Sequence, residues 1–142
     1  MDAVQSGTDL PPAIELQQVS VEWHAAMECW SIDWKIVNKG IGPLKILSVC
    51  LPHGQFKAEE QRFDPVMRLD SAESREFDTI VRCKEPEGLV TENAFLIFQV
   101  IWSGEPWRIF TRVRVVVDSK GQPKTAVELI TTQKIGFSGV SP

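Results

Sequence analysis

One stretch of the chain, residues 29–51, constrains the fold more than any other. Apolar and polar side chains alternate in it from Trp30 to Ile36, which is the two-residue period of a β-strand with one buried face. The pattern then breaks at Asn38, Gly40, Gly42 and Pro43. Asn and Gly tolerate φ > 0 and Pro presets φ. Because an apolar pattern resumes afterwards, the sequence predicts two β-strands joined by a glycine-proline turn.

A second stretch, residues 94–102, is apolar at both parities. This pattern is typical of a central strand that is covered on both faces. A four-residue hairpin connection follows at residues 103–106, and residues 107–117 alternate again as its partner strand. We expect residues 125–137 to fold over the second face of the 94–102 strand, because large uncovered apolar patches are rare. A homodimer that covers the same face is the alternative.

Three other segments carry weaker signals. Val19, Val21 and Trp23 share one parity of an expected first strand. Residues 55–68 suggest a long loop with at most a short edge strand, because Pro65 has no N–H for a ladder. Residues 125–130 fit either a last strand or a short helix.

These alternating segments and the Pro/Gly turns between them predict the fold class. It is all-β, an antiparallel immunoglobulin-like β-sandwich of about seven to eight strands. A chain of 142 residues has the size of one domain. We expect a flexible N-terminal arm over residues 1–12, the sandwich over residues 13–131 and a loose C-terminal tail over residues 132–142.

The run I-V-N-K-G-I-G-P-L-K-I-L-S-V, residues 36–49, resembles a turn found in a known group of modules. It is similar to the N-x-G-x-x-P-L-x-I turn of the ASPM/SPD-2/hydin-type immunoglobulin-like modules, which sit beside the major-sperm-protein and pilus-chaperone sandwiches. The L-x-P-G-x-S turn that follows in those families is replaced by residues 69–74, which lack the Pro-Gly pair. The resemblance implies a non-catalytic scaffold or adhesion-type module.

Charge and cysteine content narrow the cellular setting. The formal net charge of -4 argues against non-specific binding to nucleic acid or to an anionic membrane. The N-terminus has no basic start followed by an apolar core, and no apolar run approaches the roughly 18 residues of a membrane helix. Cys29, Cys50 and Cys83 form no C-x-x-C motif. We therefore expect reduced thiols and a cytoplasmic protein.

The candidate binding residues lie on the 107–117 strand and share one face of it. If that face is exposed, its guanidinium groups suit carboxylates or phosphates on a protein partner. The alternative is a solvated face whose arginines pair with acids on the neighbouring strand. Residues 94–102 offer no carboxylate, which favours binding. The candidates are Arg108, Phe110, Arg112 and Arg114.

The five tryptophans raise a carbohydrate-binding alternative, because exposed indole rings can stack on sugars. Strand parity instead directs Trp23, Trp30, Trp34 and Trp107 toward a core, and Trp102 lies in the doubly apolar strand. Packing of the core is the simpler explanation.

A small metal- or thiol-dependent enzyme is a further alternative, with His24, Cys29, Cys50, His53 and Cys83 as its candidate ligands or nucleophiles. Close spacing occurs in one place, the Cys50-Leu51-Pro52-His53 run, and a zinc site would need further ligands from other loops. No phosphate-binding loop or G-x-S-x-G nucleophile motif occurs. We therefore expect no enzyme activity, cofactor or metal, and an unknown protein partner.

Overall fold

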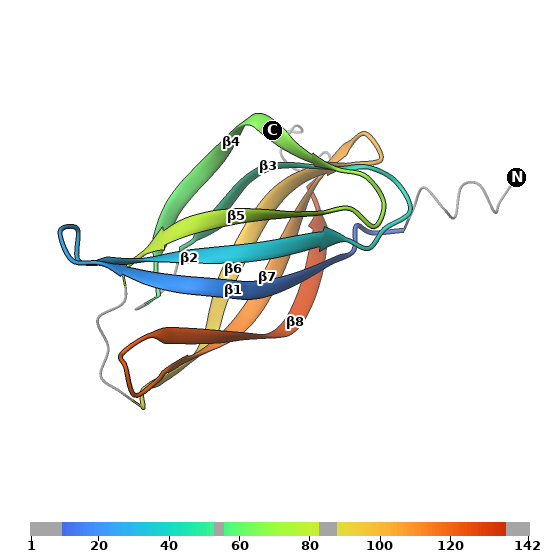
Figure 1. Cartoon of the computed structure of the whole chain (residues 1–142). Helices are drawn as coiled ribbons and strands as arrows, with labels where there is room; N and C mark the ends of the chain where they lie inside the picture. The colour runs from blue at the N-terminus through green and yellow to red at the C-terminus, as the bar shows by residue number, and fades with distance from the viewer. Residues whose placement is uncertain (1–9, 53–55, 83–87, 136–142) are drawn as a thin grey trace, which may run out of the picture.

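The computed structural model describes residues 10–52, 56–82 and 88–135. All eight secondary-structure elements in these residues are β-strands. The strands pair antiparallel in two sheets, which confirms the all-β sandwich and its expected number of strands (Figure 1). The elements are β1 (Ile14–His24), β2 (Cys29–Asn38), β3 (Leu44–Leu51), β4 (Ala58–Leu69), β5 (Ser74–Val81), β6 (Val90–Trp102), β7 (Glu105–Val117) and β8 (Pro123–Lys134).

One sheet has three strands in the order β1-β2-β5, and the other has five in the order β4-β3-β6-β7-β8. Figure 1 shows the three-stranded sheet in front, with β6 and β7 running obliquely behind it. The core lies between the sheets, because the buried residues of each strand fall at alternate positions. Burial of each large apolar side chain stabilises the fold by roughly 1.5–3 kcal/mol. Fully buried examples are Ile32, Trp34, Leu96, Phe98 and Ile109.

The strand-turn-strand over residues 29–51 is confirmed, and its two strands belong to different sheets. Asn38 organises the crossing: its Nδ2 donates to Gly42 O at 2.8 Å and Leu69 O at 3.0 Å, and its Oδ1 accepts from Gly40 N at 2.9 Å. The expected reason for the glycines was wrong, because neither Gly40 nor Gly42 has a positive φ. Gly40 is needed for space, since an added Cβ would lie 2.5 Å from Cη2 of Trp102.

β1 contains an irregularity that alternation did not predict. Its register with β2 shifts between Gln18 and Ser20, so the pattern changes parity at Val19. Val19 is exposed, which contradicts its expected place on a face shared with Val21 and Trp23. The Gln18 side chain bridges to β8, donating to Pro123 O at 3.0 Å and accepting from Thr125 N at 2.9 Å. The bulge therefore helps to join the two sheets along this side.

β4 is a full edge strand where only a long loop with a short strand was expected. Its register against β3 jumps from Met67 to Arg62. Pro65 falls in the interval that is left out of the ladder, so its missing N–H costs no hydrogen bond. This is why a proline at this position is compatible with a strand.

β8 corrects the expectation for residues 125–137, of which residues 136 and 137 lie outside the described part. The segment pairs with β7 along its whole length, from Trp107↔Lys134 to Val117↔Pro123. It therefore extends the sheet and does not cover the second face of β6. The physical reason is that β7 would otherwise present a row of unpaired backbone groups. The ladder also continues to Lys134, past residue 131, where we expected the sandwich to end.

Candidate functional site

The four predicted binding residues lie together on the outer face of the five-stranded sheet. On β7, Ile109, Thr111 and Val113 are buried toward the core, and the residues between them point the other way. Arg108 and Arg114 are exposed, and Phe110 and Arg112 are half-buried. The structure thus places all four on one surface that faces away from the core.

Apolar side chains from the neighbouring strands share this surface. In the ladders, Phe110 is opposite Ile97 of β6, and Arg112 is opposite both Phe95 of β6 and Leu129 of β8. Side chains directly opposite each other in a sheet point to the same side. Phe95 and Ile97 are half-buried, and Leu129 is 47% exposed. We call this surface the arginine face: Phe95, Ile97, Arg108, Phe110, Arg112, Arg114 and Leu129.

Two of the arginines have carboxylates nearby, which the sequence did not predict for β6. Arg114 Nε lies 3.8 Å from Glu92 Oε1, because β6 begins at Val90 and so includes an acidic residue. Arg112 Nε lies 4.0 Å from Glu128 Oε1, a distance too long for a hydrogen bond. Such partly exposed ion pairs contribute about 0–1 kcal/mol. The alternative in which the arginines pair with acids on neighbouring strands therefore holds for two of the three arginines, and these contacts are weak.

The hydrogen-bonding capacity of the arginine face is not filled by these contacts. The Nε of Arg112 is buried without a hydrogen-bond partner among the described residues. Arg108 forms no salt bridge within that part of the chain. Its guanidinium acts on Cys50 of β3: burial raises the pKa of the Cys50 thiol, Glu60 raises it further, and the Arg108 charge lowers it. The electrostatic influence of Arg108 therefore extends across the sheet to β3.

The tryptophans divide into buried and accessible rings. Trp30, Trp34 and Trp102 are buried, as parity predicts, and Trp107 is half-buried with Lys134 Nζ 6.0 Å from its ring centroid. Trp23 was expected to point to the core but is 41% exposed, with its ring 5.0 Å from that of Trp30. The carbohydrate alternative would thus depend on Trp23, the one tryptophan of the five that is exposed, and one side of its ring is already occupied by Trp30.

The candidate metal and thiol residues are not brought together in the part of the chain that the structure describes. No group of three or more His, Cys, Asp or Glu side chains there is arranged to hold a metal ion. Cys29 is buried and Cys50 is half-buried, both as free thiols. His24 is half-buried at the end of β1. His53 and Cys83 lie outside the described residues.

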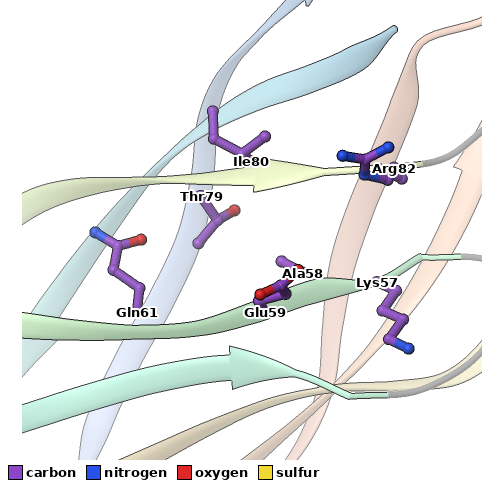
Figure 2. Close-up of a pocket in the computed structure, with 7 residues that line it drawn as sticks. All are labelled: Lys57, Ala58, Glu59, Gln61, Thr79, Ile80 and Arg82. Carbon is purple, nitrogen blue, oxygen red and sulfur yellow. The ribbon is translucent and has the colours of Figure 1, made fainter. Parts of the chain in front are cut away.

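A cleft that the sequence gave no sign of lies between β4 and β5 (Figure 2). It has a volume of about 440 Å³ and takes its walls from the edges of the two sheets. Strand alternation predicts which side chains share a face, but it does not predict how the edges of two sheets approach each other. No pattern in the sequence could have identified this site.

Among the residues described, no helix is long and apolar enough to cross a membrane. Neither protein-family models nor curated proteins give a significant match to the sequence.

Proposed function

We propose that this protein is a non-catalytic interaction module that binds another protein through the arginine face. The observation that supports this most is the composition of that face. Exposed or half-exposed guanidinium groups alternate along β7 with an aromatic ring and stand beside apolar side chains of β6 and β8. Aromatic residues and arginine are enriched at protein interfaces, where a buried apolar centre and directional polar contacts act together.

The chemistry of the face favours a partner segment that carries carboxylates. Arg112 and Arg114 have ion-pair distances of 4.0 and 3.8 Å to their own acids and donate no hydrogen bond within the described residues. A guanidinium group can form two parallel hydrogen bonds with a carboxylate, and these are stronger than neutral ones. A partner carboxylate would therefore gain contacts that Glu128 and Glu92 do not already make.

Charge reversal tests this proposal. The variant Arg112→Glu/Arg114→Glu is compared with Lys35→Glu/Lys39→Glu, whose exposed lysines lie on and just after β2 in the other sheet. Both variants change the net charge by the same amount. Wild type and the two variants, each with a verified fold, are used for affinity capture from an extract of the source cells. A protein retained by wild type and the lysine variant, and lost by the arginine variant, is the expected result; identical captures would refute the proposal.

We extend this proposal to the type of module, its cellular location and its oligomeric state. An immunoglobulin-like module of the ASPM/SPD-2/hydin type is compatible with a three-plus-five sandwich. We propose the cytoplasm as its location. The free thiols of Cys29 and Cys50 suit a reducing compartment. Cell fractionation tests the location. Light scattering separates a monomer from the homodimer, whose paired arginine faces would bring like charges together.

A further inference from the structure

The cleft between β4 and β5 is bounded by two sheet edges. β5 is the outermost strand of the three-stranded sheet, and β4 is the outermost strand of the five-stranded sheet. Figure 2 shows the two strands facing each other across the cleft, with Arg82 and Lys57 at one end. The described residues that line it are Lys57, Ala58, Glu59, Gln61, Thr79, Ile80 and Arg82.

The two strands touch at both ends of this cleft. At one end, Arg82 N–H donates to Lys57 O at 3.1 Å in an isolated β-bridge. At the other end, the rings of Phe63 and Phe77 meet edge to face, with centroids 5.8 Å apart. Between these contacts, β5 presents the short side chain of Thr79 toward the interior. The cleft is therefore a preformed opening of limited length, closed at each end by a direct contact.

The backbone of β5 within the cleft has unpaired groups. Arg82 points its N–H toward β4, and alternation along a strand directs the N–H and C=O of Ile80 and Asp78 the same way, opposite to β2. No β-bridge joins Ile80 or Asp78 to β4 in the described chain. β5 also pairs with β2 without any irregularity. Its free edge is thus a regular row of donors and acceptors, which is a template for another strand.

The charges at the bridged end favour an acidic ligand. Lys57 and Arg82 are exposed and form no salt bridge with any described residue. Glu59 also lines the cleft, so its carboxylate offsets one of the two positive charges. Two cationic groups against one acid leave a net positive end, and a ligand carboxylate placed there would be attracted.

We propose that this cleft binds an extended peptide segment of a partner protein, which adds antiparallel to the free edge of β5 and places a carboxylate beside Lys57 and Arg82. A volume of about 440 Å³ lies within the range of ligand sites. Main-chain hydrogen bonds supply affinity in this mode of recognition, and side-chain contacts supply selectivity. β4 is the poorer template, because its own register is interrupted twice. The site shares no residue with the arginine face, so the two proposals stand or fall separately.

The probe is the peptide acetyl-EVTV-amide, which is short enough to lie between the two end contacts and whose acidic first residue lies nearest Arg82 in an antiparallel strand. Binding is followed by amide chemical-shift changes in the isotope-labelled protein. The expected result is a saturable set of shifts in β5 and in residues 57–61. A peptide N-methylated at alternate residues, which cannot donate to the edge, is expected to lose at least about tenfold in affinity. Replacing its acidic residue with lysine should cost about fivefold.

Protein variants test the same contacts from the other side. Ile80→Pro removes the N–H that faces the cleft and leaves the β2 ladder intact, whereas Ile80→Ala keeps the N–H and removes only the side chain. We expect the proline variant to lose at least about tenfold in affinity and the alanine variant to change little. Arg82→Glu should weaken binding about fivefold, and Arg75→Glu, on the far side of Phe77, should not.

Several results would overturn this proposal. They are the absence of shifts in β5 at millimolar peptide, equal affinity of the N-methylated peptide, and shifts confined to the arginine face. Concentration-dependent dimerisation through β5 in light scattering would assign the edge to a second copy of the chain instead. If Ile80→Pro does not fold, the N-methylated peptide still decides whether backbone hydrogen bonds at this edge carry the binding.

Discussion

Substitution of Gly40 by alanine is expected to destabilise the protein, although the backbone at this position is not strained. The added Cβ would lie 2.5 Å from Cη2 of Trp102 and 3.2 Å from two other atoms of the ring. Ordinary contact begins at 3.4 Å, so the closest atom must withdraw by about 0.9 Å (3.4 minus 2.5). Trp102 is buried, and its Nε1 donates to Leu10 O at 2.8 Å. Withdrawal of the ring therefore disturbs both its packing and this hydrogen bond.

The magnitude follows from three terms. Overpacking of a core site costs about 1–3 kcal/mol. Loss of the Trp102 hydrogen bond adds about 0.5–1.5 kcal/mol, and the reduced freedom of the unfolded chain returns about 0.4–1 kcal/mol. We therefore expect the free energy of unfolding to fall by roughly 0.5–4 kcal/mol, with a middle value of about 2 kcal/mol. Gly42→Ala is the matched control, because its Cβ would lie 3.8 Å from the same ring and neither glycine has a positive φ.

Urea denaturation followed by tryptophan fluorescence measures both variants against wild type. The midpoint for Gly40→Ala should fall with an unchanged m-value, since the surface exposed on unfolding is the same. Gly42→Ala should remain within about 0.5 kcal/mol of wild type or be slightly more stable. Equal stability of the two alanine variants would refute the argument that Trp102 excludes a side chain at Gly40.

Three other predictions concern single side chains. In wild type, Trp34 Nε1–H donates to Thr79 Oγ1 at 3.0 Å. Thr79→Val leaves this donor without an acceptor in the core and should lower the free energy of unfolding, measured in urea, by about 1–3 kcal/mol; an unchanged midpoint would contradict this. Arg108→Gln should raise the pKa of Cys50 above its already raised value, because a positive charge that lowers it is removed; peptide-resolved alkylation across pH measures this, and an unchanged profile would show that Arg108 does not act on the thiol. Backbone N–H groups of the following turn donate to the Asp118 carboxylate and lower its pKa, and nearby lysines lower it further. The contribution of Asp118 to stability is therefore present above the unfolded pKa of about 3.9 and is lost as the pH falls through the lower folded pKa. Wild type should therefore melt higher than Asp118→Asn at pH 6, and this difference should shrink as the pH falls below the unfolded pKa. A pH-independent difference would exclude this linkage.

The sequence was sufficient for the parts of the fold that depend on one strand at a time. Alternation between Trp30 and Ile36 specifies the buried face of β2, and the partner strands β6 and β7 follow from their apolar patterns and the hairpin signal between them. The hairpin connection itself has two residues, Ser103 and Gly104, where four were expected, because Glu105 and Pro106 already belong to the β7 ladder. The predicted features are local, because the period of side chains along a strand depends only on the strand itself. The same reasoning placed Arg108 and Arg114 together on one face.

Features that depend on contacts between strands were not predictable in the same way. The bulge near Val19 changes parity without any glycine or proline to mark it. β6 begins at Val90, and its register with β7 shifts between Thr91 and Ala94. Glu92 therefore belongs to β6 although the expected strand began at Ala94, and the sequence did not predict it as the ion-pair partner of Arg114. The role of Gly40 depends on Trp102, which is distant in sequence. In each case the deciding contact comes from another strand, and alternation does not report it.

The most direct test of the proposed function is a binding isotherm for the captured partner against three proteins. These are wild type, Arg112→Glu/Arg114→Glu and Lys35→Glu/Lys39→Glu. If the arginine face carries the interaction, the arginine variant should bind at least about tenfold more weakly, and the lysine variant should bind like wild type. Equal affinities for all three proteins would contradict the account and remove the outer face of the five-stranded sheet as the binding surface.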